Sequence, residues 1–174
     1  MIHYVNGNLL DSDVDYICHQ VNCQGVMGSG IAGQIKARWP IVYESYIAKY
    51  EAAKKYVSSD GERHFADELL LGNIQIVALW EDYYKTDFHQ SVINIFAQQY
   101  YGYDKKRYTS YDAFWSCLNK IKYNIPKGSK IGFPDHIGCG LGGANWTIIR
   151  TMIEVVLGED FEVYIYNYDG GNNK

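Results

Sequence analysis

The chain alternates short apolar runs with longer segments in which apolar residues recur every three or four positions. Short runs bounded by turn residues are typical of buried strands, and the longer spacing is typical of helices that pack on a sheet. The sequence predicts strands at 2–5, 16–21, 91–96, 130–133 and 162–166. It predicts helices at 31–38, from Pro40 to about 56, from a cap at Thr109 or Ser110 to about 123, and at 145–157.

The middle of the chain has a less regular pattern. Residues 57–67 and 80–90 are polar and are predicted as loops. Two apolar stretches, 68–71 and 74–79, flank the turn dipeptide Gly72-Asn73. This arrangement predicts either a hairpin or a bulged strand pair, because such dipeptides favour tight turns between strands.

Strands that alternate with helices predict a three-layer α/β/α fold with a mixed central sheet and helices on both of its faces. A length of 174 residues suits one domain. We assign this domain to residues 1–168 and expect residues 169–174 to form a flexible tail. In sheets of this type, ligands bind outside the carboxyl ends of the strands.

Two glycine-rich segments follow predicted strands and lead into predicted helices, at 22–33 and at 136–143. Glycine lets the backbone approach a ligand closely, and the free N–H groups at a helix start attract anions. Both segments leave the carboxyl ends of strands, so we expect them to converge on one crevice that holds an anionic ligand. The alternative is that they are two ordinary structural turns.

The motifs in these segments resemble those of macro domains. The matching stretches are VNGNLL (5–10), CHQVNCQGVMGSGIAGQI (18–35), GFPDHIGCGLGGANW (132–146) and VYIYNY (163–168). They are most similar to a branch that contains ADP-ribose-1''-phosphate phosphatases and hydrolases that remove ADP-ribose from glutamate or from DNA. Small bacterial and phage proteins also occur in this branch. The resemblance implies the macro domain fold and a cleft for ADP-ribose.

The resemblance also implies roles for individual residues. Asn8 stands where macro domains usually carry an aspartate that accepts the adenine amino group, and Asn22 matches an asparagine beside the distal ribose. The implied ligand-binding residues are Asn8, Leu9, Asn22, Gly28, Ser29, Gly30, Ile31, Gln98, Ile137, Gly138, Cys139, Gly140, Leu141, Gly142 and Tyr166. Two of these residues can instead have a purely structural role. Asn8 can simply adopt the backbone conformation of a turn, which asparagine tolerates, and Tyr166 can be a core residue.

The sequence departs from the hydrolases of this branch at their catalytic positions. Gln98 stands where they carry a lysine, and glycine replaces an acid that some of them carry in the second loop. Glutamine can neither form a covalent adduct with an opened ribose nor act as a base. Lys105 and Lys106 lie further along the chain and could substitute only if their loop folds back.

Asp135 and His136 are the candidate catalytic residues, because they stand at the mouth of the second glycine-rich loop. A histidine can protonate a leaving group or activate water near neutral pH. In the alternative reading, His136 bonds to the backbone and Asp135 caps a turn. His19 lies inside a predicted strand, where we expect a buried structural histidine.

The charge and the cysteine content limit the kinds of partner and compartment that we expect. The net charge of −4 and the pI of about 5.7 argue against a nucleic-acid partner. The negative net charge does not exclude a nucleotide ligand, since backbone N–H groups can bind a diphosphate without lysine. Four cysteines without a CxxC pair predict a reduced, cytoplasmic protein in which Cys23 and Cys139 fill loops. We expect a monomer with no metal, no cofactor and no membrane segment.

Three functions are therefore compatible with the sequence. The protein can bind ADP-ribose or a close derivative and also dephosphorylate ADP-ribose-1''-phosphate through His136. It can instead be a reader or sponge that binds such nucleotides without catalysis. The hydrolysis of ADP-ribose from protein or DNA is the third possibility, and Gln98 counts against it.

Overall fold

The computed structural model describes residues 2–56, 61–62, 65–79 and 89–168. Its centre is a six-stranded sheet with the strand order β1-β6-β5-β2-β4-β3. The strands are β1 (Ile2–Asn6), β2 (Tyr16–Asn22), β3 (Ile74–Ala78), β4 (Ser91–Gln98), β5 (Lys130–Pro134) and β6 (Glu162–Asn167). β3 is antiparallel to β4 and the other neighbours are parallel, which confirms the predicted mixed sheet.

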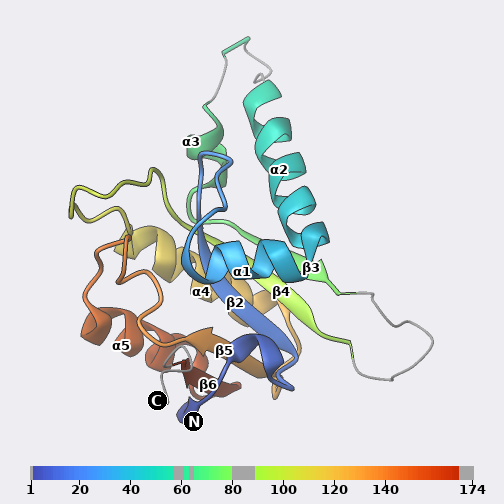
Figure 1. Ribbon diagram of the computed structural model, residues 1–174, viewed down its shortest axis with the longest axis vertical. Coiled ribbons are helices and arrows are strands. Elements are labelled where there is room, and N and C mark those ends of the chain that lie inside the picture. The colour runs from blue at the N-terminus through green and yellow to red at the C-terminus, as the bar shows by residue number, and fades with distance from the viewer. Residues whose placement is uncertain (1, 57–60, 63–64, 80–88, 169–174) are drawn as a thin grey trace.

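Helices cover both faces of the sheet, so the predicted three-layer α/β/α architecture is confirmed (Figure 1). The helical segments are η1 (Leu9–Asp11), α1 (Gly30–Arg38), α2 (Pro40–Lys55), α3 (Ala66–Leu70), α4 (Tyr111–Asn124) and α5 (Trp146–Leu157). In Figure 1, α1 crosses in front of the sheet and α4 lies behind it. Within the described residues, no helix is both long enough and apolar enough to span a membrane.

Side chains of β2 alternate between the two layers. Ile17 packs in a cluster with residues of α1 and α2, whereas Cys18 packs in a cluster with residues of α4 and α5. Val21 then joins a third cluster, with Tyr46 of α2 and Leu70 of α3. A strand buried on both faces reads as a nearly continuous apolar run, which explains why the sequence signal for β2 was clear.

Local capping signals set the helix starts. The side-chain oxygen of Ser110 accepts a hydrogen bond of 3.2 Å from the backbone N–H of Ala113, so Ser110 rather than Thr109 caps α4. Pro40 occupies the first turn of α2, as predicted. On α5, Ile149 and Ile153 are fully buried in the core cluster beneath the helix.

The predicted strand at 68–71 is wrong. Residues Ala66–Leu70 form α3, and Gly72 turns the chain into β3 with a positive φ of 81°. β3 then pairs with β4, so no hairpin forms around Gly72-Asn73. A four-residue apolar stretch fits a strand and one helical turn equally well, and packing against α2 favours the turn. The predictions for 57–60, 63–64, 80–88 and 169–174 lie outside the described residues.

A row of polar side chains crosses the sheet beneath α2. His19 Nε2 lies 2.5 Å from Asn94 Oδ1, and the amide of Asn94 donates to Gln75 Oε1 at 3.0 Å. Gln75 in turn donates to the carbonyl of Ser45 in α2 at 2.8 Å. Burial lowers the pKa of His19 to about 4, against the smaller opposing effect of its bond to Asn94. His19 is thus a buried, neutral structural histidine, as expected from the sequence.

This burial predicts a pH-dependent stability. The pKa of His19 is about 4 in the folded chain and 6.5 ordinarily. The unfolded chain therefore binds the proton more readily, and the free energy of unfolding falls as the pH drops from 6.5 towards 4. This group accounts for about 2–3 kcal/mol of that fall. Urea unfolding at pH 7 and pH 4.5 measures the change. Between these pH values, the free energy of unfolding should fall less for His19→Gln than for the wild type. An equal fall in both proteins would contradict the assignment.

Candidate functional site

A cleft of about 620 Å³ opens at the carboxyl ends of β2, β4 and β5. β2 pairs with β5 over only two residue pairs, Tyr16 with Ile131 and Ile17 with Gly132. Beyond them the two strands separate. β2 leads into α1 on one face, and β5 leads into α5 on the other. Ligands bind at such switch points in open α/β sheets.

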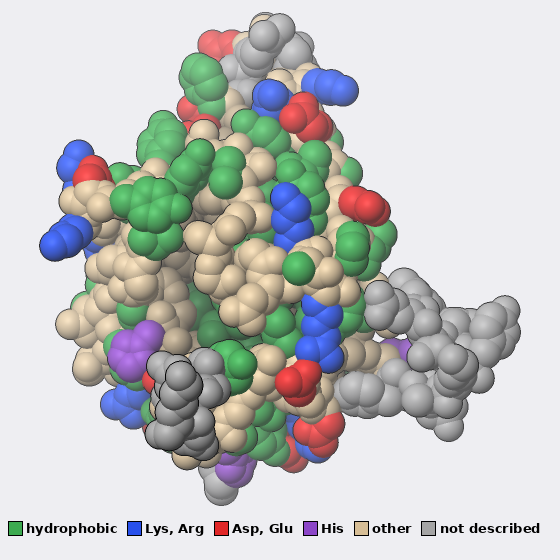
Figure 2. All heavy atoms as spheres, viewed as in Figure 1, with side chains coloured by type: hydrophobic (Ala, Val, Ile, Leu, Met, Phe, Trp, Pro, Cys, Tyr) green, Lys and Arg blue, Asp and Glu red, His purple; other side chains and the backbone are tan. Residues whose placement is uncertain are grey.

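Both predicted glycine-rich loops reach this cleft, and Figure 2 shows the hollow between α1 and the 136–142 segment. The described lining residues are Gln20, Val21, Asn22, Val26, Met27, Gly28, Ser29, Gly30, Ile31, Ala32, Gln98, Tyr101, Tyr103, Pro134, Asp135, His136, Ile137, Gly138, Gly140, Leu141 and Gly142. The structure therefore brings together thirteen of the seventeen residues singled out from the sequence. Asn8, Leu9, Cys139 and Tyr166 do not line the cleft.

The side chain of Asn22 shapes the first loop. Its amide nitrogen donates to the carbonyl of Val26 at 2.7 Å, and its oxygen accepts from Gln24 N at 2.9 Å and from the Tyr46 hydroxyl at 2.8 Å. This inward-facing amide holds the chain in a compact turn directly after β2. Asn22 still borders the cleft, so it contributes both to the loop and to the site.

The following residues expose backbone to the cleft. Gly30 begins α1 with a φ of +56°, and neither Gly28 nor Gly30 has an atom within 4 Å of the position where a Cβ would stand. Ser29 precedes the helix without capping it through its side chain. The amino end of α1 carries a partial positive charge, so this open backbone suits an anionic ligand.

The second loop is closely packed on itself. Gly138 has a φ of +73°, and its carbonyl accepts from Ala144 N at 3.0 Å and from the Thr109 hydroxyl at 2.8 Å. A Cβ on Gly142 would overlap that same carbonyl and hydroxyl. The carbonyl of Gly142 also accepts from Tyr108 N and Thr109 N, both at 2.9 Å. Glycine is therefore required at position 142 for packing, whereas Gly140 faces open space.

Amides form the floor of the cleft. The Gln20 side chain donates to Gln98 Oε1 and to the Thr109 hydroxyl, both at 2.8 Å. Gln98 in turn donates to the carbonyl of Tyr100 at 2.9 Å. Gln98 thus lines the cleft, as the motif implied. Its neutral side chain is held by these two hydrogen bonds. Gln20 was not predicted. Its signal was its position as a polar residue of β2 close to the first glycine-rich loop.

Asp135 and His136 both line the cleft and contact each other. His136 Nδ1 lies 2.9 Å from Asp135 Oδ2, and its ring stacks on Trp146 with centroids 5.1 Å apart. His136 adopts a φ of +57°, which is uncommon for a residue other than glycine. The imidazole therefore bonds to the carboxylate rather than to the backbone. A histidine held by a carboxylate can transfer protons at a bound ligand.

Asn8, Leu9 and Tyr166 lie outside the cleft lining. The Asn8 side chain accepts from Leu10 N at 3.0 Å and caps η1. Leu9 is buried in a cluster against which Tyr166 and Ile31 also pack. Tyr166 is half-buried on β6. The Asn8 cap and the packing of Tyr166 against the Leu9 cluster are the contacts that the structure shows for these two residues.

Burial disfavours the thiolate form of both loop cysteines. Burial raises the pKa of Cys139 to about 11, with a further contribution from Asp135, and its sulfur contacts the carbonyl of Ile137 at 3.4 Å. Burial raises the pKa of Cys23 to about 12, with a further contribution from Asp67. Since the thiolate is the nucleophile, both residues fill loops, as expected from the sequence.

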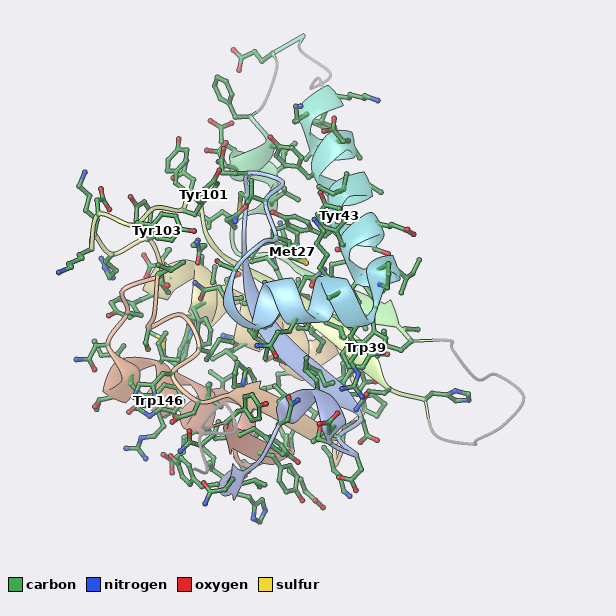
Figure 3. The ribbon with its side chains drawn as sticks, viewed as in Figure 1. Met27, Trp39, Tyr43, Tyr101, Tyr103 and Trp146 are labelled. Carbon is green, nitrogen blue, oxygen red and sulfur yellow. The ribbon has the colours of Figure 1, made fainter. Side chains whose placement is uncertain are left out.

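The segment between β4 and α4 supplies aromatic side chains to the cleft. Tyr101 and Tyr103 line it, which the sequence alone could not establish (Figure 3). Lys105 and Lys106 are exposed and do not line it, and Lys106 pairs with Asp104 at 3.2 Å. The loop therefore does not fold back to offer a lysine. None of the described lining residues is a lysine or an arginine.

No protein-family model matches the chain. Two curated proteins are similar to it in sequence. The DNA ADP-ribosyl glycohydrolase of Mycobacterium tuberculosis is 48% identical over 46 residues, which are 26% of this chain and 13% of that protein's length. The ADP-ribose 1''-phosphate phosphatase of Saccharomyces cerevisiae is 29% identical over 177 aligned positions, covering 94% of this chain and 97% of the phosphatase.

Solved structures define the class of fold. The macrodomain of Thermus aquaticus DarG superposes with a TM-score of 0.68 at 22% identity, over 95% of this chain and 97% of that one. Thermosipho africanus DarTG in complex with ADP-ribose gives a TM-score of 0.71 at 22% identity, over 95% of this chain and 41% of that one. The chain therefore has the macrodomain fold, as its motifs implied.

The packing of the second loop yields a stability test. Gly142→Ala should lower the free energy of unfolding by about 1–3 kcal/mol, because the new methyl group must displace backbone. Gly140→Ala is the matched control in the same loop, and should change stability by about 0.5 kcal/mol or less. Urea unfolding of both variants measures the difference. Equal stabilities would show that the loop is not packed as described.

Proposed function

We propose that this protein binds ADP-ribose or a close derivative in the cleft between its two glycine-rich loops. The observation that carries the proposal is the convergence of open backbone from both loops on one cavity, with Gly28 and Gly30 on one side and Gly140 on the other. The names of the relatives support the choice of ligand, because the glycohydrolase and the phosphatase both act on ADP-ribosyl compounds. The Thermosipho africanus neighbour was solved with ADP-ribose.

The arrangement of the cleft suggests how the ligand lies. The diphosphate lies against backbone N–H groups of 28–31 and 138–142, which requires no lysine. The distal ribose lies beside Asn22 and Gln98, and the adenine lies towards Ile31 and Tyr166. A cavity of about 620 Å³ is within the range of pockets that hold ligands of this size.

Titration calorimetry with ADP-ribose tests the proposal. Gly140→Glu places a carboxylate among the loops without disturbing their packing, since nothing lies within 4 Å of the new Cβ. It should weaken ADP-ribose binding by about a hundredfold or more, because a like charge faces the diphosphate. Val155→Glu adds the same charge on the outer face of α5, where Val155 is 64% exposed, and should leave the affinity unchanged.

Two outcomes would count against binding at this site. Retained affinity in Gly140→Glu would mean that the ligand binds elsewhere. An equal loss in Val155→Glu would mean that net charge, and not the loop, determines affinity.

A second candidate function is removal of phosphate from ADP-ribose-1''-phosphate. Two observations favour it, the contact of 2.9 Å between His136 and Asp135 within the cleft and the near full-length match to the yeast phosphatase. In this reaction His136 transfers the proton at the leaving oxygen or at the attacking water, and Asp135 orients the imidazole.

Phosphate release from ADP-ribose-1''-phosphate tests this candidate. His136→Ala should lower the rate by about 10²–10⁴-fold, the usual contribution of a general acid or base. His3→Ala is the matched control, because His3 stacks on Tyr164 and does not line the cleft. If the wild type binds ADP-ribose but releases no phosphate, the protein is a reader or sponge.

Glycohydrolase activity on protein or DNA has weaker support. The match to the glycohydrolase covers 46 residues, and Gln98 is held by hydrogen bonds to Gln20 and to the Tyr100 carbonyl. A fixed, neutral amide at this position provides no nucleophile or base. We therefore do not propose this activity.

A further inference from the structure

One end of the cleft carries two tyrosine rings that are open to water. Tyr101 is 48% exposed and Tyr103 is 76% exposed, yet both line the cavity. Figure 3 places them on the segment between β4 and α4, and Figure 2 shows apolar side chains gathered over the same segment. Exposed phenol rings at a cavity rim offer apolar faces on which a planar group can stack.

The segment that carries these rings is tied to the rest of the site. The Tyr100 carbonyl accepts from the Gln98 side chain at 2.9 Å, on the floor of the cleft. At the other end, Tyr108 donates its hydroxyl to Asp104 at 2.8 Å and its backbone N–H to the carbonyl of Gly142 at 2.9 Å. The rings are therefore presented by a segment that is anchored on both sides, which reduces the entropy lost when a ligand binds.

The described residues that line the cleft include no lysine or arginine that would repel a cation. Gln98 and Gln20 form a neutral floor, and Asp135 is the one carboxylate among the described lining residues. The cations of the same segment, Lys105, Lys106 and Arg107, do not line the cleft. Lys106 pairs with Asp104, and Arg107 lies over the ring of Tyr111. A positively charged group placed here meets no lysine or arginine among the described lining residues, and tyrosine faces attract cations.

We propose that this end of the cleft is a subsite for a planar, positively charged ring attached to carbon 1'' of the distal ribose. The nicotinamide ring of NAD⁺ has this chemistry, since it replaces the 1''-hydroxyl of ADP-ribose. The proposal rests on the proposed function, because it takes the distal ribose to lie beside Asn22 and Gln98. Tyr101 and Tyr103 then stack on the ring and discriminate between nucleotides by the group at this carbon.

Calorimetry with four ligands tests the subsite in the full chain: ADP-ribose, NAD⁺, NADH and ADP-ribose-1''-phosphate. The expected order has NAD⁺ at least as tight as ADP-ribose. NADH, whose ring is uncharged, should bind about fivefold more weakly than NAD⁺, because it loses the cation–π attraction. The 1''-phosphate should bind more weakly than NAD⁺.

Side-chain variants test whether Tyr101 and Tyr103 produce the preference for NAD⁺. In the double variant Tyr101→Leu and Tyr103→Leu, the ratio of the NAD⁺ Kd to the ADP-ribose Kd should rise about tenfold. Tyr123→Leu is the matched control, because Tyr123 is 81% exposed on α4 and does not line the cleft, and it should leave this ratio unchanged. Thermal unfolding verifies that the double variant folds, and the NAD⁺ to NADH comparison needs no variant.

The outcomes separate the two proposals. If ADP-ribose itself does not bind, the proposed function fails. If ADP-ribose binds but NAD⁺ is excluded, or if NADH matches NAD⁺, the subsite is overturned. It is overturned also if the 1''-phosphate binds more tightly than NAD⁺, or if the double variant weakens both ligands equally.

Discussion

The short pairing between β2 and β5 is the constraint on which the site depends. The two strands share only the pairs Tyr16–Ile131 and Ile17–Gly132, whereas β2 stays paired with β4 along its whole length. Beyond Ile17 the backbones of β2 and β5 part at the centre of the sheet, and the chain leaves them towards opposite faces. A cavity between two loops is the direct result. The other features, including the amide floor and the packed glycines, stabilise the edges of this opening.

Much of this arrangement could be predicted from the sequence. Strands such as β2 are buried on both faces and give a continuous apolar signal, and Pro40 and Ser110 mark helix starts through their own chemistry. The glycine-rich loops could be placed because each follows a strand. The prediction of a strand at 68–71 failed because one helical turn and a short strand have the same apolar content. Only packing decides between them.

Other parts of the site could not be predicted because they depend on contacts between distant residues. Gln20 meets Gln98 and Thr109 only once β2, β4 and the start of α4 come together. Likewise, nothing in a tyrosine-rich segment distinguishes Tyr101 and Tyr103 from their neighbours before the loop is anchored to Gly142. Asn8 shows the opposite case. Its side chain caps η1 through a hydrogen bond to Leu10, a contact between near neighbours in the sequence.

The cleft combines open backbone at its two loops with a floor of neutral amides. Backbone N–H groups and the amino end of α1 suit a diphosphate without basic side chains. The part of the cleft near Gln98 carries amides and phenol rings, and none of its described lining residues is a lysine. We propose that catalysis at this site rests on Asp135 and His136 and that its selectivity rests on the groups around Gln98. Under this proposal, binding of the nucleotide and chemistry on it depend on different residues of the cleft.

The central claim is that both glycine-rich loops hold one ADP-ribose molecule. A crystal structure of the protein with ADP-ribose tests it most directly. We predict diphosphate oxygens within about 3 Å of backbone N–H groups from both 28–31 and 138–142. The distal ribose should lie beside Asn22 and Gln98. A ligand that contacts only one of the loops, or that lies outside this cleft, would contradict the account.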